Sequence, residues 1–483
     1  MEAGQESQLR RGAAGRVRSA LPVLLALAAG LALRLWMLKG LFYAGGDTLV
    51  YGDMAKNVLL HGQYALTFAG GNLSPTLIRL PGYPLFLALC FKLFGVENYF
   101  AVTLVQIAFD LLACLLVAEF VRRIVPAPAN RGAALTALWL AVLCPFTASY
   151  TAMPLSESLT ICMLALAMWA MARFHDDPGW VNALWFTAAV TFAALLRPDG
   201  ALAGLAFAPA FFSDFRWERR ECGISLKKFA NIATVCALLA LAPFAIWTWR
   251  NWRVFHVIEP LAPRLATDPG VPANPGWERW VKTWCLDFVS TDQIYWKVEG
   301  DRLDVDQLPR RAFDSPAQYR ETAALADAYE KNGEWISPEI DAGLARLAAE
   351  RIAAHPLRYY VWLPLGRVAD MWLRPRIENL NIDFDWWVYG HHHRETEFSW
   401  AYAALNAAYL LLGVVGLCMR PRFWGALLAY MLLRSALLLT VAAPETRYTI
   451  ECFPMLFALG GVALAGLANR RYLSNLKAVF GKG

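Results

Sequence analysis

Charged residues are scarce in this chain. Only 17% of its 483 residues are charged, whereas 58% are hydrophobic. Soluble domains carry about 25% charged residues, so this composition argues against a soluble protein. Runs of about 18 to 20 apolar residues recur along the chain, and each is long enough to cross ~30 Å of hydrocarbon as a helix. The sequence therefore predicts an all-α polytopic membrane protein.

Several common signatures are also missing. The chain has no P-loop, no G-x-G-x-x-G motif after a strand and no H-E-x-x-H motif. These absences argue against a P-loop nucleotidase, a dinucleotide-binding domain and a zinc protease of the H-E-x-x-H type. The net charge is +6, but no basic stripe is interleaved with aromatic residues. We therefore expect no nucleic acid among the partners.

Cysteine and histidine give no framework for disulfides or metals. The nine cysteines lie mostly inside predicted helices, and only Cys285 falls in a long polar loop, so we expect no disulfide framework. The adjacent histidines at 391–393 look like a metal cluster, but adjacent side chains rarely share one ion. An exposed loop is the better interpretation there. The sequence leaves open whether a divalent cation takes part in the function.

Basic residues set the expected orientation in the membrane. Arg10, Arg11, Arg16 and Arg18 precede the first apolar run at 21–42, so the N-terminus should be cytoplasmic. This run lacks a short apolar core with a cleavage site. We therefore expect an uncleaved span rather than a signal peptide.

Further basic loops extend this topology. Arg122, Arg123 and Arg131 separate two apolar runs, and 214–228 is the most basic short loop, so both connections should be cytoplasmic. About ten spans result. They are predicted at 21–42, 99–121, 132–150, 155–173, 181–197, 199–213, 229–249, 398–417, 422–441 and 449–468.

Two apolar stretches do not fit as simple spans. The segment 81–95 is too short to cross, so it should dip into the membrane or lie on it. The segment 356–373 carries Arg358, Arg367 and Asp370, and it can be interpreted as a span or as an interfacial helix. We prefer the interfacial helix, because it keeps the basic C-terminus in the cytoplasm.

The chain therefore divides into three parts. Residues 1–249 form an N-terminal transmembrane module with a first external loop at 43–98. Residues 250–397 form an external α-rich subdomain with the interfacial helix, and 398–483 form the C-terminal transmembrane helices. Helices outside the spans are expected at 48–61, which lies along the interface, and at 316–332 and 338–354.

Under this topology the external turns collect acids and arginines. Arginine recognises phosphate through a planar fork of donors, and a carboxylate can deprotonate an acceptor hydroxyl as a general base. This combination at a membrane face suits a lipid substrate that bears phosphate. The residues are Asp47, Asp53, Arg79, Glu157, Arg197, Arg250, Glu445 and Arg447.

The same residues carry a resemblance to a known family. The motif D-x3-Y-x3-A contains Asp47 and Tyr51, and R-x-P-x-Y-P contains Arg79 and Tyr83. The motifs P-x2-E-S-L, L-R-P, R-N and E-x-R-Y follow in the expected order. The chain thereby resembles the GT-C glycosyltransferases that use polyprenyl-phosphate sugars. Its nearest relatives by this pattern are the aminoarabinose transferases of lipid A and the rhizobial galacturonosyl transferases, with protein O-mannosyltransferases more distant.

The resemblance implies a fold and a reaction. The fold would be a GT-C-like bundle with external interfacial helices. The reaction would move a sugar, with inversion, from a polyprenyl phosphate to a hydroxyl of a glycan, lipid or protein. It would take place on the outer face of the plasma (inner) membrane. Asp47 would be the general base, and Glu157 would position the acceptor or a divalent cation. The implied substrate-binding residues are Tyr51, Asp53, Arg79, Tyr83, Arg197, Arg250, Glu445 and Arg447.

Less specific interpretations stand beside these. Asp47 suits an N-cap of the following helix, Asp53 a solvated face, and Glu157 the first turn of a helix. Arg79 and Arg250 suit interfacial anchors. The charges inside predicted spans, at Arg34, Asp110, Glu119 and Arg434, are interpreted chiefly as structural pairs.

Two other functions share some of these features. A transporter is disfavoured, because the spans lack the paired Gly/Pro-broken helices at mid-membrane that inverted-repeat carriers show. A polymerase or ligase of surface polysaccharides would use similar lipid-linked donors.

Overall fold

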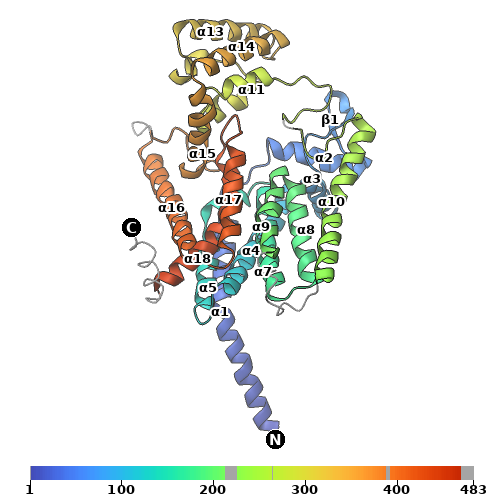
Figure 1. Cartoon of the computed structure of the whole chain (residues 1–483), viewed down its shortest axis with the longest axis vertical. Helices are drawn as coiled ribbons and strands as arrows, with labels where there is room; N and C mark the ends of the chain where they lie inside the picture. Colours follow the sequence, from blue (N-terminus) through green and yellow to red (C-terminus); the bar gives the residue numbers. More distant parts are fainter. Residues whose placement is uncertain (1, 213–225, 264, 388–391, 469–483) are drawn as a thin grey trace. The chain divides into compact units, whose positions relative to one another are not determined.

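The computed structural model describes residues 2–212, 226–263, 265–387 and 392–468. These residues form two compact units. The first unit comprises Met1–Ala266, Ala408–Tyr430 and Glu451–Gly483, and the second comprises Thr267–Ala407 and Met431–Ile450. Both are built almost entirely from helices (Figure 1). The predicted α-helical membrane fold is confirmed.

The first unit contains most of the apolar helices. A short hairpin pairs β1 with β2 antiparallel, in the loop between α2 and α3. The elements are α1 (Glu2–Leu41), α2 (Asp47–His61), β1 (Ala65–Thr67), η1 (Ala69–Gly71), β2 (Leu73–Pro75), α3 (Gly82–Phe94), α4 (Tyr99–Ile124), α5 (Asn130–Val142), α6 (Pro145–Tyr150), α7 (Glu157–Asp176), α8 (Trp180–Leu196), η2 (Pro198–Ala201), α9 (Leu202–Phe212), α10 (Leu226–Phe255) and α18 (Phe453–Ala468).

Three further elements belong partly to each unit. They are α16 (His393–Cys418), α17 (Trp424–Leu438) and η7 (Thr446–Cys452).

Six helices in the described part of the chain are long and apolar enough to cross a membrane. They lie at Ala20–Leu41, Tyr99–Ile124, Glu157–Asp176, Lys227–Phe255, His393–Cys418 and Thr446–Ala468.

Shorter helices occupy the other predicted spans. The predicted span 132–150 is split, because Cys144 precedes Pro145 and adopts an extended conformation that ends α5 before α6 begins. The predicted span 199–213 begins with the 3₁₀ turn η2, which leaves only 11 residues for α9. The predicted basic loop 214–228 falls mostly outside the described residues.

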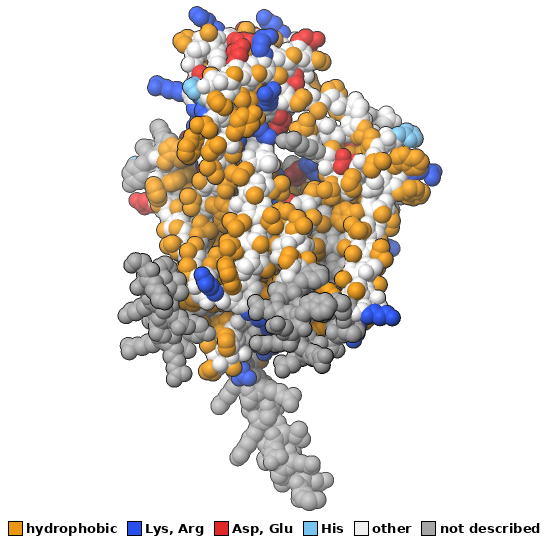
Figure 2. All heavy atoms as spheres, in the orientation of Figure 1, with side chains coloured by type: hydrophobic (Ala, Val, Ile, Leu, Met, Phe, Trp, Pro, Cys, Tyr) orange, Lys and Arg blue, Asp and Glu red, His pale blue; other side chains and the backbone are white. Residues whose placement is uncertain are grey.

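Apolar side chains cover the outward faces of the membrane helices. Leu238, Leu241 and Ile246 of α10 are each more than 60% exposed. Figure 2 shows hydrophobic side chains gathered over this helix. Such a surface suits lipid tails, which are as apolar as the side chains themselves.

Helix α7 separates two groups of charges. Arg123 of α4 and Arg422 each donate to Asp176, at 2.8 Å, at the C-terminal end of α7. Glu157 begins the same helix, which has 20 residues. A helix of that length is about 30 Å long. The charges that the sequence assigns to opposite membrane faces therefore lie at opposite ends of α7.

A buried ion pair joins α1 to α4. Arg34 Nε donates to Asp110 Oδ2 at 2.6 Å, and both residues are at most 1% exposed. Arg34 Nη1 also donates to the carbonyls of Gly30 and Val142, at 2.9 and 2.8 Å. The predicted structural pairing of Asp110 is therefore confirmed.

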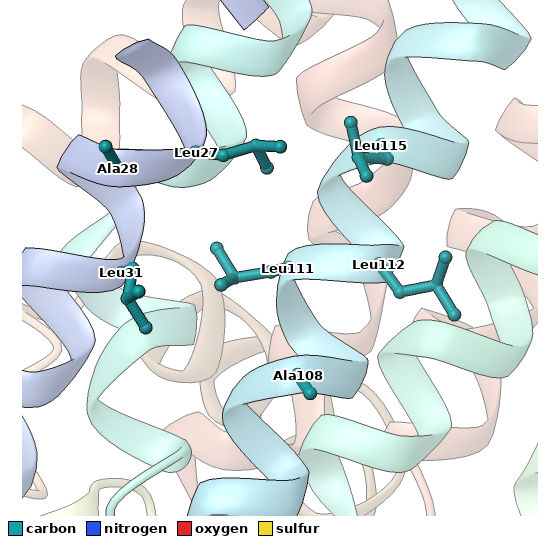
Figure 3. Close-up of a pocket in the computed structure, with 7 residues that line it drawn as sticks. All are labelled: Leu27, Ala28, Leu31, Ala108, Leu111, Leu112 and Leu115. Carbon is teal, nitrogen blue, oxygen red and sulfur yellow. The ribbon is translucent and has the colours of Figure 1, made fainter. Parts of the chain in front are cut away.

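The middle parts of the apolar segments of α1 and α4 leave an apolar hollow between them. Its volume is about 350 Å³. Figure 3 shows leucine and alanine side chains of the two helices facing it. Because the lining has no polar side chain, a lipid tail suits it better than water.

The second unit is an α-helical body with a tryptophan-rich core. Trp277, Trp280 and Trp284 are at most 5% exposed and pack with residues such as Leu347. Its helices α13 and α14 lie side by side (Figure 1). The elements are α11 (Pro275–Val281), α12 (Phe288–Gln293), η3 (Tyr295–Lys297), η4 (Val305–Gln307), η5 (Arg310–Ala312), α13 (Pro316–Lys331), α14 (Pro338–Ala354), the π-helical turn η6 (Arg358–Trp362) and α15 (Leu363–Leu373).

The predicted helices of this unit form close to their predicted bounds. Ser315 and Ser337 cap α13 and α14, each accepting a hydrogen bond from a backbone amide three residues on, and a proline follows each cap. The stretch 356–373 is also helical, across η6 and α15. Its position at the membrane surface, and that of the whole unit outside the membrane, stay predictions.

Candidate functional site

The first ion pair of the site joins the start of α2 to the loop before α3. Arg79 Nη2 donates to Asp47 Oδ1 at 2.9 Å, and the two side chains are 26% and 30% exposed. The N-cap of α2 is Gly46, whose φ of 56° favours glycine. The interpretation of Asp47 as an N-cap is therefore wrong, because Asp47 is the first helical residue and its carboxylate meets Arg79.

Tyr51 lies between the charges of the site. It follows Asp47 by one helical turn, and the Arg79 guanidinium lies 5.8 Å from its ring centre. Burial raises the pKa of Tyr51. The carboxylates of Asp47 and Glu157 raise this pKa further, whereas the positive charges of Arg79 and Arg197 lower it. Two of the predicted carboxylates and two of the predicted arginines therefore act on one phenol.

The second ion pair is more deeply buried. Arg197 follows the last residue of α8, and its Nη1 donates to Glu157 Oε1 at 3.0 Å. Glu157 is only 2% exposed, and its Oε2 has no hydrogen-bond partner among the described residues. A carboxylate in the first turn of α7 is also stabilised by the helix dipole.

Glu451 completes this second group, and the sequence analysis missed it. Its Oε1 lies 2.9 Å from Arg197 Nε, and Asp199 lies 3.4 Å from the same nitrogen. Glu451 is fully buried. The signal that would have found it is a carboxylate inside an apolar segment, since such a group needs a charged partner. Three carboxylates thus surround Arg197, so its charge is already compensated.

Contacts that involve the backbone hold the Asp47–Arg79 pair close to the group around Arg197. Thr48 Oγ1 donates to the carbonyl of Pro154 at 3.1 Å, which ties the start of α2 to the loop before α7. A Cβ at Gly82 would lie 2.6 Å from the carbonyl group of Leu195. Only glycine allows this close approach of α3 to the end of α8. Figure 1 shows α2 lying roughly crosswise to α8 and α10.

Exposure divides the roles between the two groups. Asp47 and Arg79 are accessible to a ligand, whereas Glu157 and Glu451 are nearly or fully buried. A general base must come within about 3 Å of the proton it removes. Asp47 and Arg79 can therefore contact a substrate directly, whereas the buried carboxylates hold Arg197 in position.

Three other predicted site residues have clear structural contacts. Asp53 accepts hydrogen bonds from the backbone amide and hydroxyl of Thr67, at 2.6 and 2.9 Å, and so fixes the hairpin to α2. Tyr83 is fully buried and donates to Gln106 Oε1 at 2.7 Å. Arg250 donates to the carbonyls of Thr76 and Tyr64, at 2.7 and 2.8 Å. These contacts shape the first loop, and a direct contact of these three residues with substrate stays a prediction.

Glu445 and Arg447 belong to the second unit. There they pair with each other, and the Arg447 guanidinium lies 5.6 Å from the ring centre of Tyr448. Buried Arg376 and Arg434 hold the same segment by donating to the carbonyls of Thr446 and Tyr448. The participation of Glu445 and Arg447 in the site of the first unit stays a prediction.

A possible metal-binding group occurs in the second unit. One ligand atom each from Asp383, His392 and Glu395 lies within 4.8 Å of the others. Asp383 and His392 are exposed, as predicted for the histidine loop, and His391 lies outside the described residues. The geometry allows a divalent cation, but exposed acids often gather without one.

Comparison with known protein families finds a match over part of the chain. The family described as dolichyl-phosphate-mannose-protein mannosyltransferase matches residues 76–247. This stretch includes Arg79, Glu157 and Arg197, but not Asp47 or Glu451. No curated protein matches this chain at a significant level.

Solved structures show the same fold. The oligosaccharyltransferase of Archaeoglobus fulgidus tethered to an acceptor peptide superposes with a TM-score of 0.52 at 12% identity, over 95% of this chain and 50% of that chain. The same organism's AglB, in complex with an inhibitory peptide and a dolichol-phosphate, gives a TM-score of 0.50 at 12% identity, over 97% and 52%. The chain thus spans about half the length of these enzymes.

A bacterial structure is also similar over most of its length. ArnT from Cupriavidus metallidurans, bound to undecaprenyl phosphate, gives a TM-score of 0.34 at 15% identity, over 93% of this chain and 79% of that chain. The family match and the archaeal structures confirm the predicted resemblance to GT-C glycosyltransferases.

Proposed function

We propose that this protein is an inverting glycosyltransferase that moves a sugar from a polyprenyl phosphate to an acceptor hydroxyl. The acceptor belongs to a glycolipid, polysaccharide or protein at the external face of the plasma (inner) membrane. The observation that carries the proposal is the accessible Asp47–Arg79 pair at the end of the apolar helices. The family match over 76–247 and the archaeal dolichol-phosphate complex support this class of donor.

The two side chains would divide the chemistry as follows. Asp47 removes the proton of the acceptor hydroxyl while that oxygen attacks the anomeric carbon. The bond from this carbon to the phosphate oxygen breaks, and polyprenyl phosphate leaves with the electron pair. Arg79 donates to the phosphate and stabilises its growing negative charge. The carbon is inverted because attack and departure occur on opposite faces.

The buried carboxylates have a supporting role in this proposal. Glu157 and Glu451 hold Arg197 beside Tyr51, and Tyr51 contacts Arg79. Because Glu157, Asp199 and Glu451 already compensate its charge, Arg197 acts here by joining the end of α8 to the start of α7 and to Glu451. The buried groups therefore act through the position of Arg197.

A direct assay tests the proposed reaction. The full chain in lipid nanodiscs is incubated with polyprenyl-phosphate sugars and with glycolipid extracted from a deletion strain. Mass spectrometry then follows free polyprenyl phosphate and glycosylated acceptor. We expect both products in equal amounts, and parallel reactions with EDTA decide whether a divalent cation takes part. No product from any donor, together with an unchanged surface-glycan profile in the deletion strain, would reject the transferase and favour a transporter.

Glu451→Gln tests the supporting role. The variant keeps the shape of the side chain but removes one charge beside Arg197. We expect kcat to fall about tenfold with the KM for donor nearly unchanged, because a loss of about 1.4 kcal/mol in the transition state corresponds to that factor. Glu119→Gln is the matched control, since Glu119 pairs with Arg122 in the last turn of α4, and it should leave kcat unchanged. Equal kcat values for Glu451→Gln and the wild type would remove Glu451 from the site.

A further inference from the structure

One buried arginine of the second unit has no acidic partner among the described residues. Arg367 of α15 is 2% exposed, and its Nη1 donates to the carbonyls of Lys282 and Cys285, at 3.1 and 2.9 Å. Its Nε is buried and finds no acceptor among the described residues. The buried Arg351 of the same unit differs, because Asp314 lies 3.4 Å away. A buried guanidinium without an anion is unfavourable, so an anionic ligand would stabilise Arg367.

The surroundings of Arg367 form a binding hollow. Arg367, Lys282 and Tyr359 line a cavity of about 360 Å³, together with apolar side chains that include Leu365 and Leu439. No carboxylate lines this cavity in the described part of the chain. Burial lowers the pKa of Arg367, and no aspartate or glutamate contributes to this shift. The hollow therefore combines positive charge with an apolar wall.

The neighbouring elements place the hollow at the edge of an apolar layer. Leu439 and Thr440 line it and directly follow α17, one of the shorter apolar helices. The adjoining helical stretch exposes Leu357, Tyr360 and Trp362, each by more than 60%. Exposed tryptophan and tyrosine beside leucine are typical of helices at the level of lipid headgroups.

We propose that this hollow binds the phosphate headgroup of an anionic membrane phospholipid. Arg367 and Lys282 contact the phosphate oxygens, and an acyl chain lies along Leu365 and the end of α17. The charged headgroup supplies the anion that Arg367 lacks, and the exposed apolar side chains cover the glycerol and the first methylenes. This site lies in the second unit and shares no residue with the Asp47–Arg79 pair, so it does not depend on the proposed glycosyl transfer.

Native mass spectrometry of the full chain in detergent tests the proposal. The protein is titrated with phosphatidylglycerol and, separately, with uncharged diacylglycerol of the same chains. A third arm adds inorganic phosphate as a competitor. We expect one tightly bound phosphatidylglycerol, no matching diacylglycerol complex and no displacement by millimolar phosphate.

Three variants make the test specific. Arg367→Gln and Lys282→Gln should each weaken the phosphatidylglycerol complex about tenfold, because each removes charge-assisted hydrogen bonds. Lys282→Gln leaves the backbone contacts of Arg367 intact, so it remains informative if Arg367→Gln does not fold. Arg346→Gln removes an exposed arginine that pairs with Glu321, and it should bind like the wild type. Wild-type affinity in both hollow variants, equal binding of diacylglycerol, or displacement by inorganic phosphate would each overturn the lipid site.

Discussion

Asp47→Asn is expected to lower the rate of glycosyl transfer by two to four orders of magnitude. General-base catalysis by a positioned carboxylate contributes roughly 10²–10⁴-fold, and asparagine cannot accept the proton. The side chain keeps its size, and its oxygen can still accept from Arg79. The donor lipid should therefore bind at least as well as in the wild type, since Arg79 loses a competing anion. Single-turnover kinetics and a separate donor-binding measurement distinguish these two effects.

Asp53→Asn is the matched control for this experiment. Asp53 lies on the same helix, is also polar and partly accessible, and holds Thr67 through two hydrogen bonds. Asparagine can keep one of these bonds, so we expect less than a fivefold change in rate, about 1 kcal/mol. If Asp47→Asn retained wild-type turnover, Asp47 would not be the base. If both variants were equally impaired, the effect would come from the shape of the first loop.

The part of the site formed by Asp47, Tyr51 and Arg79 could be predicted from the sequence. Asp47 and Tyr51 are spaced by one helical turn, and the expected topology placed Arg79 in the same external loop. The structure brings these residues together as expected. Local periodicity and charge were sufficient there, because the partners lie within one loop and its two flanking helices.

The buried half was predicted only in part: the motifs indicated Glu157 and Arg197, but not Glu451. Glu451 and Arg197 are far apart in the sequence, and their contact depends on how α18 packs beside α7 and α4. No local pattern encodes that packing. Arg250 was predicted to bind substrate, but in the structure it donates to backbone carbonyls. A sequence does not distinguish an arginine that binds phosphate from one that binds carbonyls. Only the acceptor in the folded chain distinguishes the two roles.

The break in the predicted span 132–150 has a similar origin. Its apolar composition is continuous, so hydropathy alone predicts one helix. Pro145 forces an extended residue before it, and α5 and α6 become separate helices. Val142 is the last residue of α5, and its carbonyl accepts a hydrogen bond from Arg34. An interrupted helix can lie inside a membrane protein when another side chain satisfies its free backbone groups.

Arg34→Leu is expected to destabilise the first unit by about 3–5 kcal/mol, because it leaves Asp110 buried without its partner. The variant also removes the donor to the carbonyls of Gly30 and Val142. Adding Asp110→Leu should recover most of the loss, since two apolar side chains can replace a buried ion pair with little net change. Thermal unfolding in one detergent, read by the fluorescence of the tryptophans, measures the three variants against the wild type.

The exposed pair of Arg122 and Glu119 provides the control for this cycle. Their side chains are 46% and 32% exposed, and exposed pairs contribute about 0–1 kcal/mol. Arg122→Leu should therefore shift the midpoint only slightly. If Arg34→Leu shifted it no more than Arg122→Leu, the inner pair would not stabilise the contact of α1 with α4. If the double variant were worse than either single change, the hydrogen bonds to the backbone carbonyls, rather than the ion pair, would hold α1 in place beside α4 and α5.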